Sequence, residues 1–210
     1  MPTPALSAVP ALDRPGRRVA LLDAADRILA REGPTASMAA IATEAGITKP
    51  ILYRQFGDKA GLHAALVERH TERLLETLHR SLRQGGSPRE RIWRTIDVYF
   101  QAIEAEPQLY RFLLHSVGAV EVHGQVRGFV DRLAALLADG IASELGLSAG
   151  SVRARVWARG IVGMVQACGD GWISSGTPRR VQLVRELTDL LWGAYPEAVA
   201  ARGANRIEPD

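Results

Sequence analysis

The chain has 210 residues, about 47% of them hydrophobic and 23% charged, which is typical of a globular protein. Its formal charge of +3 permits nucleic-acid binding without indicating it. The single cysteine, Cys168, excludes a disulfide framework and a thiolate zinc cluster within one chain. Since no tract approaches the ~18 apolar residues of a membrane span, we expect a cytoplasmic protein with no membrane partner.

Residues 1–16 should form a disordered arm, because four prolines fall within the first 15 positions. Helical periodicity begins near Arg17 and ends at Gly33-Pro34. The apolar residues of this first helix recur at helical spacing on one predicted buried face: Val19, Leu22, Ala25, Ile28 and Leu29.

Eight more helices are expected, separated by glycine and proline breaks, over about 38–45, 49–55, 59–83, 88–105, 108–116, 124–145, 151–174 and 178–193. No alternating β-branched runs bounded by hairpin turns occur, so the predicted fold is all-α with about nine helices. We place an N-terminal domain at 17–64, a larger helical domain at 65–200 and a flexible tail at 201–210.

The segment from Ser37 to Lys59 has the pattern of two short helices joined by a tight turn. Ile41 and Ala45 point to one face of the first helix, and Ala42 is small where two helices must cross closely. Gly46 supplies the turn, since glycine adopts positive φ at little cost, and Ile47 then enters the core.

The second short helix presents polar groups from its start. Thr48 is expected to cap it, and Pro50 fits the first turn, where a missing N–H is harmless. Its inner side carries Ile51, Leu52 and Phe56. Facing outward at or near its start are Thr48, Lys49, Tyr53 and Arg54. This is the helix-turn-helix pattern, in which the second helix enters the major groove of DNA.

The same segment resembles the DNA-binding domain of the tetracycline-repressor (TetR) family over about residues 17–66. The resemblance is carried by Ile41-Ala42 with Ala45-Gly46, by Tyr53 followed by Phe56, and by Lys59 followed by Leu62. Two departures are mild: Ser37-Met38, where the family more often has Thr and an aliphatic residue, and Gly57, before the next helix.

The resemblance implies a role for each matching residue. Tyr53 and Lys59 would contact phosphates, and Ser37 and Thr43 would hydrogen-bond to backbone oxygens of DNA. Base edges or nearby phosphates would be met by Thr48, Lys49, Pro50 and Arg54. Lys49 and Lys59 are the only two lysines of the chain.

Three arginines, Arg14, Arg17 and Arg18, precede or open the first helix. They form either an arm that reaches the minor groove or a solvated helix start. The sequence leaves both interpretations open.

Family architecture further implies a dimer built by the last two long helices, each pairing with its symmetry mate. The expected interface residues are small on the first of these helices and apolar on the second: Gly160, Gly163, Ala167, Val184, Leu187 and Leu191. The alternative is that both faces form core within one chain.

An effector pocket is expected among the central helices, lined by large apolar side chains that suit an apolar or aromatic ligand. The candidates are Trp93, Ile96, Phe100, Tyr110, Leu113, Leu114, Trp157 and Met164. The alternative for each of them is plain core.

No catalytic pattern competes with this interpretation. The five histidines form no metal-binding motif, and nucleophile-elbow, P-loop and dinucleotide glycine patterns do not occur. We therefore expect no enzyme, no metal and no cofactor. The predicted function is a dimeric repressor that binds a near-palindromic operator in double-stranded DNA and is released by a small, largely apolar effector. An adaptor protein that has lost DNA binding is the alternative.

Overall fold

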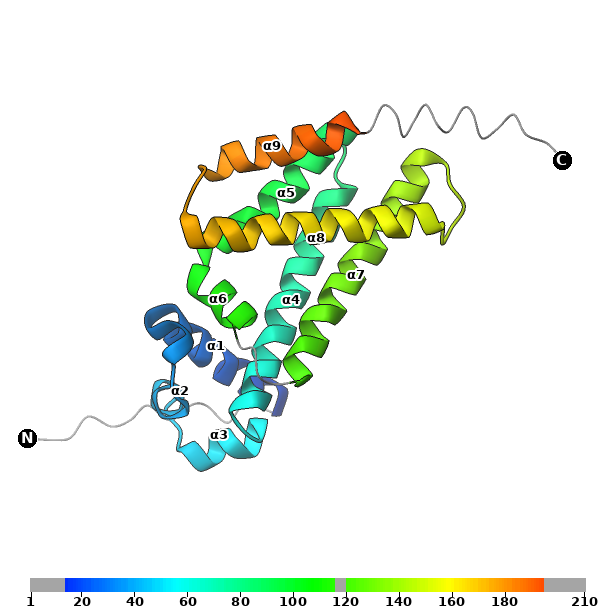
Figure 1. Ribbon diagram of the computed structural model, residues 1–210. Helices are drawn as coiled ribbons and strands as arrows, with labels where there is room; N and C mark the ends of the chain where they lie inside the picture. The colour runs from blue at the N-terminus through cyan, green and yellow to red at the C-terminus, as the bar shows by residue number, and fades with distance from the viewer. Residues whose placement is uncertain (1–13, 116–119, 195–210) are drawn as a thin grey trace, which may run out of the picture. The chain divides into compact units, whose positions relative to one another are not determined.

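The computed structural model describes residues 14–115 and 120–194 and contains only helices within them (Figure 1). The predicted tail and residues 1–13 of the predicted arm lie outside the described residues. The helices are α1 (Arg14–Glu32), the 3-10 helix η1 (Gly33–Thr35), α2 (Met38–Glu44), α3 (Lys49–Phe56), α4 (Lys59–Arg83), α5 (Pro88–Ala105), α6 (Pro107–His115), α7 (Val120–Leu145), α8 (Val152–Ser175) and α9 (Arg180–Gly193). The all-α prediction with about nine helices is confirmed.

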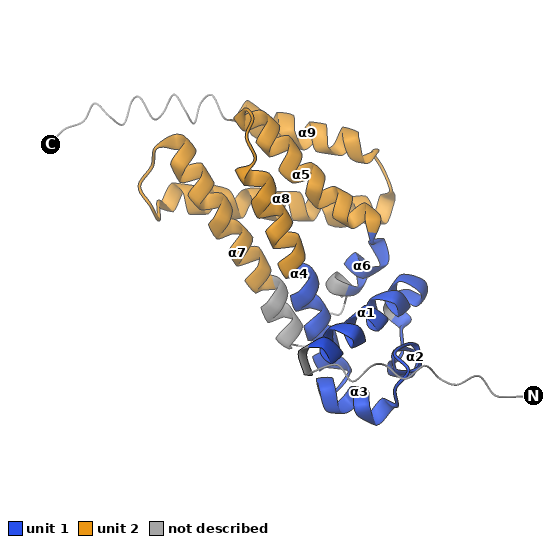
Figure 2. Cartoon of the chain, turned by 180° about the vertical axis from the view of Figure 1, so that it is seen from behind, with its two compact units in different colours: residues 1–71, 106–126 blue, residues 72–105, 127–210 orange. Residues whose placement is uncertain are grey.

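The chain divides into two compact units (Figure 2). The first comprises residues 1–71 and 106–126, and the second comprises residues 72–105 and 127–210. The division falls inside α4 and gives α6 to the first unit. It differs from the domain boundary that the sequence suggests at residue 64.

The core of the first unit forms where α1, α2, α3, α4 and α6 bring buried apolar side chains together. Ile28, Leu52 and Leu66 are almost wholly buried there, which makes these helices one packed body. Val19 was predicted on the buried face of α1, and that prediction is wrong, because its side chain is 53% exposed. It lies one turn before Asp23, on the polar side of the helix.

Helix α6 belongs to the first unit because it packs on η1 and α1. Phe112 is buried in the same core as the α1 and α4 side chains. The side chain of Gln108 lies directly against Gly33, where a Cβ would be only 3.0 Å from Gln108 Oε1. Gly33 also has a φ of 63°, which glycine adopts readily. The chain after α5 therefore returns to complete the N-terminal unit.

The second unit holds the last part of α4 and two helix pairs. Small residues on α7 (Ala134, Ala138, Ala142) pack against Ala154 and Ala158 of α8, so these two helices approach closely. Helix α9 packs along α5 with buried Val184 and Leu187. Ion pairs join the start of each of these helices to the far part of the other, which makes them antiparallel.

Two helices of the second unit, α5 and α8, begin with side-chain caps. Ser87 Oγ accepts from Glu90 N at 3.3 Å while Glu90 Oε2 accepts from Ser87 N at 2.8 Å, which is a capping box at the start of α5. The backbone N–H of Ser87, followed by its side chain, lowers the pKa of the Glu90 carboxyl. Ser151 caps α8. In the part of the chain described, no helix has the length and apolar character needed to cross a bilayer.

Candidate nucleic-acid interface

Helices α2 and α3 form a helix-turn-helix unit around a tight turn. Gly46 has a φ of 65°, the left-handed conformation that glycine adopts without strain. The turn is closed by Gly46 N donating to Thr43 O at 3.0 Å and Ile47 N donating to Ala42 O at 2.9 Å. Leu52 and Phe56 anchor α3 in the core, so its opposite face is left to solvent.

The predicted DNA-contacting side chains lie on this exposed side of the first unit. All eight are exposed, on α2 and at its N-cap, on α3 and at its N-cap, and at the start of α4: Ser37, Thr43, Thr48, Lys49, Pro50, Tyr53, Arg54 and Lys59. Tyr53 is 43% exposed although it is a large aromatic residue. The structure thus brings these groups to one end of α3 and its flanks.

Ser37 and Thr48 use their hydroxyls differently. Ser37 Oγ accepts from Ala40 N at 3.1 Å and caps α2, which leaves its O–H free to donate. Thr48 holds the N-cap position of α3, but the predicted capping hydrogen bond is not made. Its carbonyl accepts from Ile51 N at 3.0 Å, while its hydroxyl has no partner among the described residues.

The start of α4 is held close to the end of α3. Asp58 Oδ1 accepts from Gly61 N at 2.7 Å and caps the helix, as predicted. A Cβ at Gly61 would lie 1.9 Å from the carbonyl oxygen of Phe56, so only glycine allows this approach. Lys59, in the first turn of α4, is thereby placed next to the end of α3.

Two ion-pair groups fix α1 to its neighbours. Glu44 of α2 accepts from Arg27 at 2.7 Å and from Arg31 at 3.0 Å, both on α1. The hydrogen bond from Arg27, followed by that from Arg31, lowers the pKa of the Glu44 carboxyl. The packing of α2 on α1 is therefore reinforced by charge.

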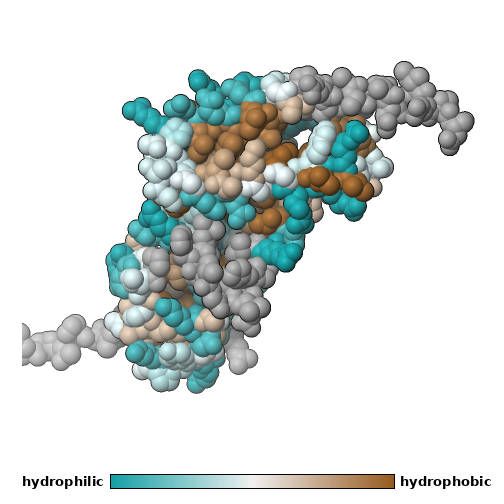
Figure 3. Space-filling view, in the orientation of Figure 1, coloured by the Kyte–Doolittle hydropathy of each residue, from teal (hydrophilic) through white to brown (hydrophobic). Residues whose placement is uncertain are grey.

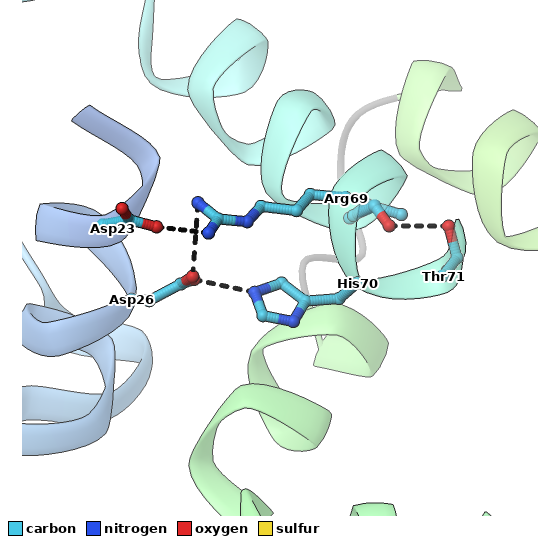
Figure 4. A network of polar contacts seen from close by, with 6 residues as sticks. Asp23, Asp26, Arg69, His70 and Thr71 are labelled. Atoms are coloured by element: carbon cyan, nitrogen blue, oxygen red, sulfur yellow. Dashed lines mark hydrogen bonds and ion pairs between the residues drawn. The ribbon is translucent and has the colours of Figure 1, made fainter. Parts of the chain in front are cut away.

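The second group joins α1 to α4 (Figure 4). Arg69 donates to Asp23, and its other terminal nitrogen lies 3.6 Å from Asp26. His70 Nε2 lies 2.7 Å from Asp26 Oδ1. Arg69 and His70 are mostly buried, whereas the Asp23 side chain is 45% exposed, so water reaches these contacts from the α1 side. They attach the stretch of α4 that ends at Thr71 to α1.

His63 is buried between α4 and α6. Its ring lies 4.3 Å from that of Phe112, and Nε2 lies 3.4 Å from the Phe112 carbonyl oxygen. Burial, with a smaller contribution from the charge of Lys59, lowers the pKa of His63. Nδ1 is buried without a partner among the described residues. A neutral histidine is thus part of the packing of this unit.

The residues predicted to line a pocket are placed unevenly. Ile96 and Phe100 are buried on α5, and the Phe100 ring meets Trp172 of α8 edge to face at 5.5 Å. Trp93 and Trp157 are partly exposed, and Met164 is half-buried on α8. Tyr110 lies on α6, in the first unit. The side chains of Leu113 and Leu114 lie outside the described part.

The predicted dimer residues divide into two groups. Gly160, Gly163 and Ala167 are exposed along α8. Val184 and Leu187 are buried within the chain itself, and Leu191 is half-buried. No group of three or more potential metal ligands occurs in the described part of the chain.

The contacts that attach α4 to α1 and α6 were not predicted from the sequence. Asp23 and Asp26 are three apart on one side of α1, a spacing that marks a shared face. Their partners lie more than 40 positions away, as the separation of 44 between Asp26 and His70 illustrates. Helical periodicity carries no information on such a pairing.

Two family models match the chain. The one described as "Bacterial regulatory proteins, tetR family" matches residues 21–66. The one described as "Tetracyclin repressor-like, C-terminal domain" matches residues 77–207. Together they cover both the helix-turn-helix unit and the helices that follow it.

Curated relatives match over nearly the whole chain. It is 30% identical over 195 residues to the HTH-type transcriptional activator FasR of Mycolicibacterium smegmatis, covering 91% of this chain and 88% of that protein. It is 31% identical over 191 residues to an uncharacterized HTH-type transcriptional regulator of Mycobacterium tuberculosis, covering 90% and 81%.

Solved structures share the fold. A tetR-family transcriptional regulator from Streptomyces coelicolor superimposes with a TM-score of 0.75 at 21% identity, over 92% of this chain and 87% of that one. FadR from Bacillus subtilis in complex with stearoyl-CoA gives 0.64 at 19% identity, over 83% and 97%. The chain belongs to the tetracycline-repressor family and is a transcriptional regulator with an N-terminal helix-turn-helix DNA-binding domain.

Proposed function

We propose that this regulator binds a near-palindromic operator as a homodimer, with one α3 helix in the major groove of each half-site. The observation that carries the proposal is the exposed start of α3. Thr48 keeps a free hydroxyl there, and Lys49, Tyr53 and Arg54 are exposed beside it. Phosphate contacts from Tyr53 and Lys59 would set the register, and base contacts from the start of α3 would specify the sequence.

An exposed face of α8 supports the dimer. Its members recur at spacings of three or four and are all exposed: Val152, Val156, Gly160, Gly163 and Ala167. The opposite face of α8 is already buried against α7. Val181 and Leu190 of α9 add exposed apolar surface, and the space-filling view shows apolar patches along α8 and beneath α9 (Figure 3).

On α9, the interface proposed from the structure differs from the one expected from the sequence. Val184 and Leu187 are buried against α5, so they are left out of the proposed interface, which rests on the exposed face of α8. Gly160 and Gly163 allow a second α8 to approach closely, because neither has any atom within 4 Å of the position of a Cβ. Burial of exposed valines in such an interface stabilises a dimer by ~25 cal/mol per Å² of apolar surface.

The proposed effector is small and largely apolar. Phe100 and Trp172 form an aromatic contact between α5 and α8, near Tyr99 on the same helix as Phe100. Apolar pockets in regulators take ligands by burying most of the ligand's surface. The structural neighbour FadR from Bacillus subtilis holds stearoyl-CoA, a molecule with a long apolar chain, which favours this class of effector.

We propose that the protein represses transcription. Activation is kept as the alternative because of one similar protein. The similar protein of Mycolicibacterium smegmatis is named an activator. A reporter gene behind the DNA upstream of this protein's own gene separates the two. Repression lowers reporter output when the protein is present, and activation raises it.

The test of operator binding is fluorescence anisotropy on that upstream DNA at several salt concentrations. Wild type, the double variant Tyr53→Phe with Lys59→Ala, and Arg31→Ala are compared. Arg31 is a matched control because it is a basic residue of the same unit that is already paired with Glu44. We expect tight wild-type binding that weakens steeply with salt, uniform weakening in the double variant, and wild-type behaviour in Arg31→Ala.

Two results would contradict the proposal. Equal wild-type affinity for the upstream DNA and for random duplex, followed by failure to select any sequence, would favour the adaptor. Addition of stearoyl-CoA, with coenzyme A alone as control, tests the effector class. If stearoyl-CoA changes neither operator affinity nor melting temperature, stearoyl-CoA is excluded as the effector.

A further inference from the structure

We infer that the DNA-contacting surface extends beyond the helix-turn-helix to Arg17 and Arg18 at the start of α1, which contact backbone phosphates from a helical segment. This inference rests on the proposed function. It adds two residues that neither the helix-turn-helix pattern nor the family resemblance assigns.

The first observation is how the cations of the N-terminal unit are paired. Arg27 and Arg31 are paired with Glu44, and Arg69 is paired with Asp23. Arg111 also has an interaction partner. In contrast, five basic side chains make no ion pair with any carboxylate in the described part of this unit: Arg17, Arg18, Lys49, Arg54 and Lys59.

The unpaired cations are not scattered. Lys49 and Arg54 lie on α3, and Lys59 opens α4. Arg17 and Arg18 are in the opening turns of α1, whose start is drawn beside the junction of α3 and α4 in both Figure 1 and Figure 2. The paired arginines lie further along α1 and α4. Positive charges that form no ion pair with a carboxylate are therefore concentrated around α3. Such a cluster attracts the phosphates of DNA.

The second observation is a contact between Arg18 and the end of α3. Its guanidinium carbon lies 5.0 Å from the centre of the Phe56 ring, a cation–π contact with the last residue of α3. Phe56 is one turn after Tyr53 and three residues before Lys59, the two residues proposed to hold phosphates. Arg18 is thus held against the end of α3 by an uncharged partner, which leaves its charge available to DNA.

The helical state of these residues decides between phosphate and minor-groove contact. An arm that follows the minor groove is an extended segment, whereas α1 already begins at Arg14. Arg17 and Arg18 therefore project from a rigid helix, and Arg17 is exposed on it. A side chain presented in this way reaches the phosphate backbone, so its contribution is independent of the base sequence.

The experiment is operator binding by full-length Arg17→Ala and Arg18→Met across a salt series. Methionine keeps an apolar stem on Phe56, which limits loss of packing. Arg31→Ala on the same helix is the matched control, and Arg17→Lys tests rescue by charge alone. For each lost phosphate contact, the slope of log affinity against log salt should fall by about 0.9. A homodimer loses two contacts with each substitution, so the deficit relative to wild type should shrink about twelvefold between roughly 50 mM and 200 mM salt.

The outcomes separate this inference from the proposed function. If wild type binds its operator and both variants keep the slope of wild type and of Arg31→Ala, the inference is overturned and the operator-binding function stands. If the loss appears only with A·T-rich flanks, minor-groove contact replaces phosphate contact and the inference is overturned too. The inference is supported if three results are obtained together. The slope of log affinity against log salt is shallower with every flanking DNA sequence, the variants melt at the wild-type temperature, and Arg17→Lys restores the wild-type slope.

Discussion

Thr48 stands at a position where a side chain ordinarily stabilises its helix. Its backbone is extended, as an N-cap requires, yet its hydroxyl makes no capping hydrogen bond. A capping side chain contributes about 1 kcal/mol to stability. At the start of α3 this contribution is absent, and the hydroxyl stays exposed where base edges are expected.

We predict that Thr48→Asp raises stability and weakens DNA binding. Aspartate is a better N-cap than threonine, and its charge complements the helix dipole, so the gain in free energy of unfolding should be about 1 kcal/mol. The same negative charge repels phosphate. Thermal melting and operator anisotropy measure the two effects. Unchanged operator affinity in a stabilised variant would contradict the assignment of Thr48 to the interface.

His63 gives the N-terminal unit a dependence on pH. Because burial lowers the pKa of the folded histidine below its ordinary value of 6.5, the unfolded chain takes up a proton first as the pH falls. The stability that the neutral ring contributes is complete above pH 6.5 and is lost as the pH falls from there through the folded pKa.

The corresponding prediction concerns His63→Gln, which stays neutral at every pH. Urea unfolding at about pH 7.5 and about pH 5.5 should show a larger loss of stability for wild type than for this variant. His79→Gln, on the same helix outside the Phe112 contact, is the control. Equal losses for wild type and His63→Gln would show that another group carries the pH dependence.

At the scale of elements, α5 and α9 are joined by ion pairs that differ in burial. Asp97 is buried, accepts from Gln101 Nε2 at 2.6 Å, and is paired with Arg180, which also binds Glu104 at 2.7 Å. At the other end, Arg89 and Asp189 form a pair in which both side chains are about half exposed. The chemistry is the same, but water screens only the second pair.

We predict unequal costs for breaking the two pairs. Asp97→Ala leaves a mostly buried guanidinium with one partner, so the free energy of unfolding should fall by about 2–3 kcal/mol. Asp189→Ala should lower it by less than about 1 kcal/mol. Urea unfolding at one protein concentration compares them. Equal costs would mean that burial does not set the strength of these contacts.

The sequence predicted the elements well because their ends are marked by particular residues. Gly46, Asp58, the pair Ser87-Pro88, and Gly176 each sit at a break that the structure shows. The packing of α6 on α1 and η1 was not predictable, because periodicity shows that a helix has an apolar face and not which helix covers it. Val19 was misassigned for a related reason, since spacing alone does not locate the edge of a buried face.

The exposed groups of the candidate interface were also predictable, since they depend on local helix geometry. The ion pairs that leave some cations free and neutralise others were not, because they join helices far apart in the chain. Arg31 and Arg17 have the same chemistry and lie on the same helix. Only the position of Glu44 in the folded unit distinguishes them.

At the scale of the whole molecule, the proposed dimer predicts an asymmetry between two exposed glycines. Gly163 of α8 and Gly140 of α7 are exposed, and both have open space where a Cβ would lie, so we expect leucine to be accommodated at either position in the single chain. Leucine also favours a helix over glycine by about 0.5–1 kcal/mol. Gly163→Leu should nevertheless dissociate the dimer, because it separates the two α8 helices.

Sedimentation velocity and operator binding measure this difference. Gly163→Leu should become monomeric and lose operator affinity while keeping its helical content. Gly140→Leu should remain dimeric and bind as wild type does. Dimeric Gly163→Leu with full affinity would place the interface on another face.

The central claim is that α3 reads a specific DNA sequence, and selection from random duplex DNA tests it most directly. Wild type and Lys49→Ala are each used to enrich bound sequences over repeated rounds. The account predicts that wild type enriches a near-palindrome with half-sites about one helical turn, or a multiple of it, apart. Lys49→Ala should relax the preference at one position in each half-site. No enriched sequence with wild type, or an identical motif after α3 is altered at Lys49, Tyr53 and Arg54 together, would contradict it.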